Sequence, residues 1–169
     1  MDYVSKVIPK ADIKNLQLFD PVWVSGCSLL HDPFASPGTL TYLREVIEQK
    51  SFLMANAPSV FGNSGGGLFE GKSGNLLGLT SRVTLANTMF GVDIMTWMEF
   101  STHPERLYEF FEHNELQFLY DPKDDYYAAA DRRERKRKDA VRQLLFEKAP
   151  EKPQDGPGYP YDPGVDDER

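Results

Sequence analysis

Cysteine is scarce in this chain, basic residues are outnumbered by acidic ones, and long apolar runs are missing. Its 169 residues include one cysteine, Cys27, which cannot form an internal disulfide and fits a reducing compartment. A net charge of −7 has the wrong sign for a protein that binds nucleic acid over its whole surface. No apolar run is long enough to cross a membrane, and residues 1–6 lack the basic and apolar regions of a secretory signal. We therefore expect a cytoplasmic protein that binds neither nucleic acid nor membranes.

Composition divides the chain near residue 120. Residues 1–120 hold nearly all the aliphatic side chains, so the core is expected there. Residues 121–148 are expected to form a charged helix, beginning at about Tyr126, whose charges can pair along a solvated face or dock on an acidic partner. Residues 149–169 are acidic, rich in proline and glycine, and poor in aliphatic side chains, a composition that predicts a disordered tail.

The pattern within residues 1–120 is that of a mainly β domain with one helix. Short runs of β-branched, aromatic and aliphatic residues alternate with turn-forming residues. A helix is expected over residues 104–113, since Pro104 suits a first turn and Ser101 or Thr102 can cap it. The second half of residues 39–49 fits a helix as well as a strand. The expected strands are residues 21–26, 39–47, 51–56, 67–70, 75–83 and 91–100.

Two motifs overlap in the glycine-rich segment at residues 61–80. The first, over residues 66–73, satisfies the P-loop pattern, in which backbone amides bind phosphates and Lys72 and Ser73 would reach phosphate and Mg²⁺. A P-loop opens a helix, whereas a strand-like run follows Ser73. The residues inside the loop, Leu68 to Glu70, are also bulky and acidic. Nucleotide binding is therefore a remote alternative.

The second motif is Gly-Asn-Ser-Gly-Gly over residues 62–66, and it indicates an activated serine. A serine hydroxyl is a poor nucleophile unless a base takes its proton, and the tetrahedral intermediate needs amide donors for its oxyanion. A glycine at Gly62 permits the backbone to turn its N–H toward that oxyanion, beside the N–H of Ser64. Gly65 and Gly66 permit the loop to approach the following strand closely.

Around this loop, over about residues 16–115, the sequence resembles the C-terminal β-barrel of the trypsin-like serine peptidases. The likeness is to the bacterial high-temperature-requirement type, with its Gly-Asn-Ser-Gly-Gly loop, a strand, a glycine-containing hairpin and a return strand. The resemblance implies a mainly β chain: a six-stranded antiparallel β-barrel of the trypsin-like fold, a C-terminal helix, and an appended charged helix. Residues 1–120 would be the barrel domain, with the first barrel of the family largely absent.

The resemblance also implies a serine endopeptidase that hydrolyses a polypeptide substrate through an acyl-enzyme on Ser64. No cofactor and no metal are implied. Residues 57–59 would lie near the pocket for the side chain before the scissile bond. They include no carboxylate, so a small or apolar side chain is expected there. The oxyanion hole would be formed by the amides of Gly62 and Ser64, and the edge that pairs with an extended substrate by Thr80, Ser81 and Arg82.

The catalytic base is the missing part of this pattern. Such peptidases carry the histidine and the aspartate on a first barrel, and too few residues precede the barrel pattern here to form one. His31, His103 and His113 are expected to be surface or capping residues. Asp2 is similar in its surroundings to the family's aspartate, and Asp12 is a poorer match.

We therefore expect the nucleophile-bearing half of an enzyme. The other half would come from further upstream or from a partner chain. The alternative is a non-catalytic, peptidase-like binding module. In either case an apolar patch is expected where a second barrel would pack.

Overall fold

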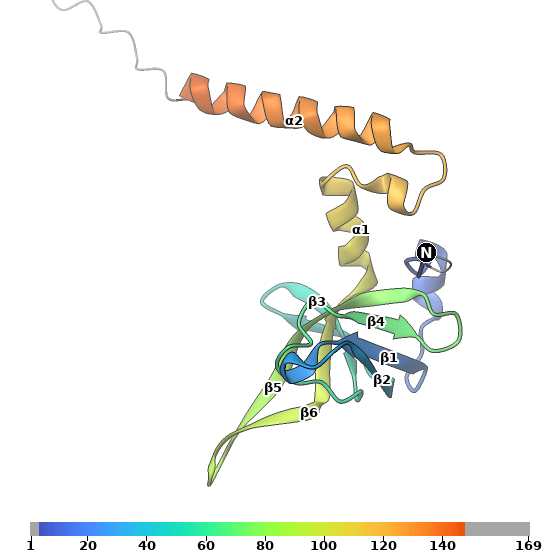
Figure 1. Cartoon of the computed structure of the whole chain (residues 1–169), viewed down its shortest axis with the longest axis vertical. Coiled ribbons are helices and arrows are strands. Elements are labelled where there is room, and N and C mark those ends of the chain that lie inside the picture. Colours follow the sequence, from blue (N-terminus) through green and yellow to red (C-terminus); the bar gives the residue numbers. More distant parts are fainter. Residues whose placement is uncertain (1–3, 148–169) are drawn as a thin grey trace, which may run out of the picture. The chain divides into compact units, whose positions relative to one another are not determined.

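The computed structural model describes residues 4–147, and its six strands close into one antiparallel barrel (Figure 1). The strand order around the barrel is β1-β2-β3-β6-β5-β4, and β4 pairs with β1. This confirms the mainly β fold class with a helix after the last strand. The elements are β1 Pro21–Gly26, β2 Phe34–Ile47, β3 Lys50–Ala55, β4 Gly67–Glu70, β5 Leu76–Thr88, β6 Gly91–Thr102, α1 Pro104–His113 and α2 Tyr126–Glu147.

The barrel is filled by side chains that alternate along its strands. On β1, Val22 and Val24 are buried while Trp23 between them is 44% exposed, as the two-residue period of a strand requires. Leucines from four other strands meet these valines in one apolar core. The burial of this cluster is the main stabilising contribution to the barrel. These leucines are Leu40, Leu53, Leu68 and Leu77.

Strand positions follow the predictions, but β2, β5 and β6 extend beyond the expected residues, β6 by two residues to Thr102. β2 begins at Phe34 because residues 34–39 pair with β1, and the helical alternative for its second half is wrong. β5 runs on to Thr88 because its last residues pair with the start of β6. β5 and β6 therefore extend beyond the barrel as a hairpin (Figure 1), with Met89 and Phe90 almost fully exposed at its tip.

The barrel is completed by the segment before β1 and by α1. Val7 forms a parallel bridge with Leu76 at the start of β5, and Ile8 is buried in the core. The Tyr108 hydroxyl of α1 donates to the Ile8 carbonyl at 2.6 Å. The expected cap of α1 by Ser101 or Thr102 is wrong, because both residues belong to β6. The N-cap is His103, whose Nδ1 accepts from the Glu105 amide at 3.3 Å.

The chain divides into two compact units between Ala130 and Asp131, inside α2. At the start of α2, the Asp125 carboxylate accepts from the Tyr127 amide at 2.8 Å. Further along the helix, Glu134 forms ion pairs with side chains three and four residues later, as expected for a charged helix. The predicted tail at residues 149–169 lies outside the described residues. Within residues 4–147, no helix combines the length and apolar character that a membrane span requires.

Candidate active site

The candidate nucleophile, Ser64, lies in the loop between β3 and β4 and is exposed to solvent. Two hydrogen bonds tie this loop to β5. The Gly65 amide donates to the Thr80 carbonyl at 2.8 Å, and the Thr80 amide donates to the Gly66 carbonyl at 2.8 Å. The two glycines that follow the serine are therefore paired with a barrel strand, while the serine side chain stays accessible.

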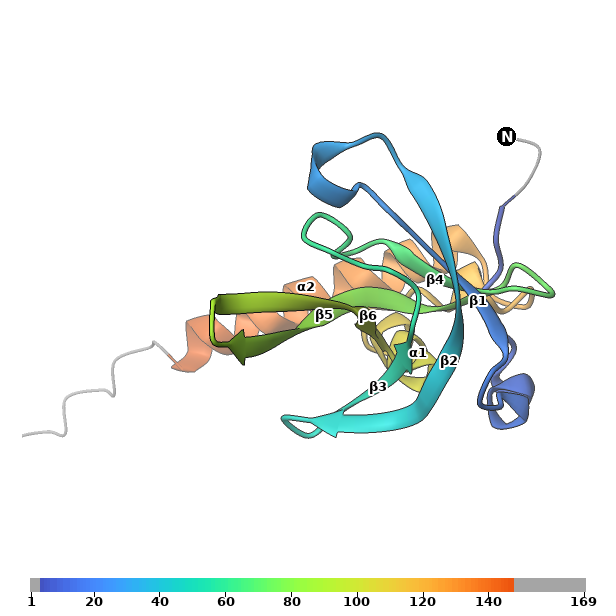
Figure 2. The same cartoon turned by 90° about the horizontal axis from the view of Figure 1, so that it is seen from below.

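The other side of the loop is fixed by the short 3₁₀ turn Ser28–Leu30, which lies beside it in Figure 2. The Leu29 amide donates to the Phe61 carbonyl at 2.9 Å. Asn63 is buried, and its side-chain oxygen accepts a hydrogen bond from the Ser28 hydroxyl. No local pattern predicts this contact, because Ser28 and Asn63 are 35 positions apart.

Two positions of the loop require glycine, because a Cβ would clash with neighbouring backbone and, at Gly62, because φ is positive. Gly62 has φ of +101°, and a Cβ there would lie 2.3 Å from the Cys27 carbonyl oxygen. A Cβ on Gly66 would lie 2.0 Å from the Ser25 carbonyl oxygen. In the described part of the chain, neither the Gly62 amide nor the Ser64 amide donates a hydrogen bond. Neither N–H group therefore has an acceptor within these residues, as an oxyanion hole requires.

A cavity of about 340 Å³ brings the predicted nucleophile and the predicted substrate edge together. The remaining walls are apolar side chains of the loop and of β5. Arg82 pairs with Glu48 at 2.5 Å, and its guanidinium lies 5.4 Å from the centre of the Phe52 ring. Both backbone polar groups of Thr80 are occupied by the loop. The lining residues include Ser64, Thr80, Ser81, Arg82, Phe61 and Val83.

Glu99 on β6 has a fully buried carboxyl group, and the sequence analysis did not single it out. The Ser101 hydroxyl donates to one of its oxygens at 2.6 Å. Burial raises the pKa of Glu99 to about 7, against the opposite effect of the Ser101 and Thr80 hydroxyls. Its position as the single charged residue of the apolar run at residues 94–100 was the available signal.

The structure places no base on Ser64. In the described part of the chain, the Ser64 hydroxyl makes no hydrogen bond, so no histidine holds it. His31 is exposed, and His113 is exposed at the end of α1. The Asp12 carboxylate accepts from the Asn15 amide group in a 3₁₀ helix, and Asp2 lies outside the described residues.

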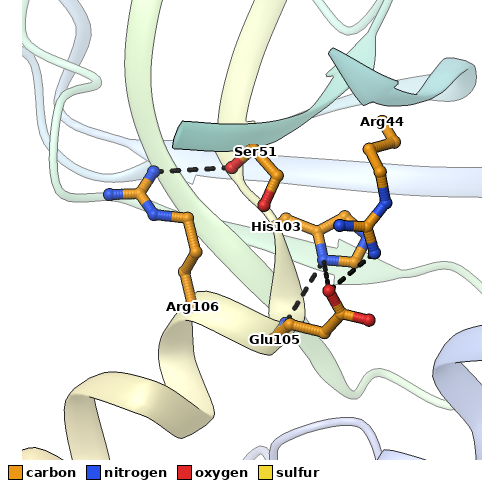
Figure 3. Close-up of polar contacts among 5 residues, drawn as sticks. All are labelled: Arg44, Ser51, His103, Glu105 and Arg106. Atoms are coloured by element: carbon orange, nitrogen blue, oxygen red, sulfur yellow. Dashed lines mark hydrogen bonds and ion pairs between the residues drawn. The ribbon is translucent and has the colours of Figure 1, made fainter. Parts of the chain in front are cut away.

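His103 is buried at the start of α1 and belongs to a separate polar cluster (Figure 3). Its Nε2 lies 3.4 Å from the Arg44 guanidinium, and Arg44 pairs with Glu105 at 2.6 Å. Burial, together with the charge of Arg44, lowers the pKa of His103 to about 4. These residues line a cavity of about 630 Å³ that Ser64 does not line. The size of this cavity therefore says nothing about the chemistry of Ser64.

The P-loop motif does not form a P-loop. Residues 71–75 are the turn between β4 and β5, so that a strand and not a helix follows Ser73. The Ser73 hydroxyl donates to the Glu70 carboxylate, and the Lys72 ammonium lies 3.6 Å from Asp20. Both side chains that would hold phosphate and Mg²⁺ face carboxylates instead.

The barrel has the same fold as part of solved HtrA-type protease structures. The HtrA-type protease AlgW with a decapeptide matches with a TM-score of 0.53 and 17% identity, over 64% of this chain and 32% of that chain. AlgW with a tripeptide matches with a TM-score of 0.50 and 16% identity, over 68% and 36%. This chain thus spans about a third of the length of these proteases. The sequence matches no protein-family model and no curated protein.

Proposed function

We propose that the chain is the nucleophile-bearing half of a serine endopeptidase that cleaves polypeptides. The observation that carries this proposal is the cavity that Ser64 shares with the middle of β5, beside two backbone amides without an acceptor in the described part of the chain. A serine that is exposed, ringed by glycines and next to a strand edge is the arrangement that acyl transfer needs. The similar AlgW structures hold peptides, which agrees with a polypeptide substrate.

In the proposed reaction, the Ser64 Oγ attacks the carbonyl carbon of the scissile bond and loses its proton to a base. The oxyanion accepts hydrogen bonds from the Gly62 and Ser64 amides, and its collapse expels the amine, which takes a proton from that base. Water then hydrolyses the acyl-enzyme by the same route. Because Thr80 already bonds to the loop, we assign substrate pairing to the backbone of Ser81 and Arg82, with Thr80 as part of the wall.

The base in this proposal comes from outside the described residues. A triad without its base retains little activity, because its members act as a unit. The preceding barrel of a longer chain, or a partner chain, would supply a histidine to Ser64. We propose a domain boundary near residue 120. Residues 1–120 would then contact the other barrel, and the charged helix would take no part in catalysis.

A fluorophosphonate probe tests the proposal, because it labels only an activated serine. The full chain and two variants, Ser64→Ala and Ser81→Ala, are treated with the probe, both alone and with any coding sequence upstream of Met1 included. Ser81 is the matched control, since its hydroxyl lines the same cavity. We expect labelling of the parent and of Ser81→Ala, strongest with the upstream sequence, and none in Ser64→Ala. Absence of labelling in both contexts would contradict the endopeptidase.

A non-catalytic peptidase-like binding module is the second candidate. It is favoured by the lack of a hydrogen-bonded histidine at Ser64 in the described part of the chain. Such a module binds extended peptides without turnover, and its affinity is the same in the parent and in Ser64→Ala. Peptide-library binding to both proteins, followed by mass spectrometry for cleavage, distinguishes it from the enzyme.

A further inference from the structure

A dense run of positive charge lies in the middle of α2. Six of the seven residues 132–138 are arginine or lysine and Glu134 is the seventh, so this segment carries +5. α2 passes through it as one unbroken helix (Figure 1). At about 0.1 M salt, the attraction between exposed charges extends over roughly 10 Å. A partner of α2 therefore responds to this local charge and not to the net charge of −7 of the whole chain.

The basic side chains are distributed around the whole helix. Each residue of an α-helix is turned by roughly 100° from the one before it, so a nearly continuous basic run faces every side. Residues 131–139 include no apolar side chain, and residues 135–139 are exposed. This part of α2 therefore has no stripe that could pack on a protein core or enter a lipid surface. What it offers to a partner is charge alone.

The carboxylate inside the segment leaves most of its cations accessible. Glu134 pairs with Arg137 at 2.9 Å and with Lys138 at 3.6 Å, yet these two cationic side chains remain 74% and 73% exposed. Exposed ion pairs of this kind are weak, so a phosphate group can replace Glu134 as their partner. Within the described residues, Arg135 pairs with no carboxylate, and its Nε donates to the Asp131 carbonyl at 3.3 Å.

The spacing of these charges matches that of duplex DNA. Seven helical residues rise by about 10 Å, so a charge of +5 amounts to roughly one positive charge per 2 Å. Duplex DNA carries one negative charge per about 1.7 Å of its axis, and a single strand one per about 3.4 Å. The major groove of B-form DNA, about 12 Å wide, admits an α-helix between two rows of phosphates. A helix with cations on every side meets both rows.

From this charge spacing we infer that residues 132–138 of α2 bind duplex DNA through its phosphates, without reading its base sequence. Arginine and lysine form charge-assisted hydrogen bonds with phosphate oxygens, and these contacts are the same at every base pair. The inference goes beyond the proposed function and does not depend on Ser64. It replaces the expectation that the protein binds no nucleic acid, because that expectation rested on the net charge of the whole chain.

Fluorescence anisotropy of the full chain with a labelled DNA duplex of roughly 20 base pairs tests the inference. One variant removes four charges from α2, and a control removes four exposed lysine charges from the rest of the chain. We expect the parent and the control to bind within twofold of each other at 50 mM salt, and the α2 variant to bind at least tenfold more weakly. Equal binding by the α2 variant, or no binding by the parent, would overturn the inference. The α2 variant carries Arg135→Gln, Lys136→Gln, Arg137→Gln and Lys138→Gln, and the control carries Lys14→Gln, Lys50→Gln, Lys72→Gln and Lys123→Gln.

Glutamine is nearly as good a helix former as lysine and arginine, so the helical circular dichroism of both variants should match that of the parent. A second measurement needs no variant. The logarithm of the parent's association constant should fall with the logarithm of the salt concentration with a slope of about −4 to −5, as expected for five phosphate contacts. A slope shallower than −2 would contradict phosphate binding by this segment.

Competition with the labelled duplex identifies the class of partner. An unlabelled duplex of unrelated sequence should displace it as well as its own sequence does, because phosphates are the same in both. A single strand, polyglutamate and phosphatidylglycerol vesicles, at equal charge concentration, should each be at least fivefold less effective. Equal displacement by polyglutamate or by the vesicles would overturn the assignment to DNA in favour of an acidic protein or a membrane.

Discussion

The amide of Gly65 donates to the carbonyl of Thr80 at 2.8 Å, and this hydrogen bond joins the candidate nucleophile loop to the strand that forms the wall of its cavity. The bond has a structural consequence for the site. Thr80 also contacts the buried polar group of Glu99, so one residue connects the loop of Ser64 to the interior of the barrel. Substitutions in the loop or in the barrel interior that displace Thr80 should therefore also displace the loop that carries Ser64.

Gly66→Ala should unfold the loop or the barrel around it. The added Cβ would lie 2.0 Å from the Ser25 carbonyl oxygen, and backbone of β1 must move to admit it. We expect a loss of roughly 1–3 kcal/mol in the free energy of unfolding, measured by urea denaturation. Gly65→Ala is the control, because a Cβ there meets nothing within 4 Å and only the positive φ of +85° opposes it. A loss no larger in Gly66→Ala than in Gly65→Ala would contradict the close-approach argument.

Ser28→Ala should weaken the loop from its other side. Removal of the hydroxyl leaves the buried side-chain oxygen of Asn63 without its donor, at a cost of about 1–3 kcal/mol in unfolding free energy. Ser73→Ala removes an exposed hydroxyl that also donates to a side chain, and we expect a change below about 0.5 kcal/mol. Thermal unfolding of the two variants in parallel checks the difference. Equal losses of stability would contradict a stabilising hydrogen bond between Ser28 and the buried Asn63.

Glu99 should make the protein less stable as the pH rises. Burial raises its pKa from 4.5 to about 7 in the folded state, so that folding favours the protonated carboxyl. The stabilisation is complete below pH 4.5 and is lost as the pH rises through 7. A shift of this size amounts to roughly 3 kcal/mol.

Glu99→Gln removes this dependence, because glutamine cannot ionise. Urea denaturation of both proteins at pH 5, 6, 7 and 8 should show the parent losing stability relative to the variant across that range. A difference between the two proteins that stays constant with pH would show that Glu99 titrates normally.

His103 should have the opposite effect on stability, making the protein less stable as the pH falls. Its pKa falls from 6.5 to about 4 through burial and the neighbouring Arg44, so folding favours the neutral ring. The stabilisation is complete above pH 6.5 and is lost as the pH falls through 4, by roughly 1–2 kcal/mol once solvent screening is considered.

His103→Asn keeps a side chain that can cap α1 but cannot be protonated. Unfolding free energies of parent and variant should converge, or cross, between pH 6.5 and 4. Arg44→Gln is the complementary change, since loss of that charge should raise the pKa of His103 in a histidine NMR titration. An unchanged titration midpoint in Arg44→Gln would contradict the influence of Arg44.

Local patterns predicted most of the fold. β1 occurs at the expected residues because its alternation of buried and exposed side chains is visible over a few positions, and β4 does so because it is a short apolar run between glycine-containing segments. α1 spans the expected residues because Pro104 and its apolar stripe mark it locally. The start of β2 was missed because Pro37 and Gly38 look like a turn. Only the pairing of Pro37 with Trp23 across the sheet makes that segment a strand.

The site was predictable in part for the same reason. Ser64 and the glycines around it are contiguous, so their chemistry could be inferred from one segment. The burial of Glu99 beside Thr80 could not be predicted, because it depends on the register in which β6 pairs with β5. The capping role expected of His103 is confirmed, whereas Ser101 and Thr102, the caps expected for α1, are occupied within β6.

By itself, the sequence determined the strands, the helix after them, and the glycine loop that presents a serine, since each depends on residues that are close neighbours along the chain. The tertiary structure alone decided which groups surround that serine. Pairing of β5 with β6 sets Thr80 opposite Ser101 and buries the carboxyl group of Glu99 beside Thr80. The physical reason is that burial depends on the register between paired strands, which shifts between Thr80 and Arg82, and the alternation of residues along one strand does not contain that register.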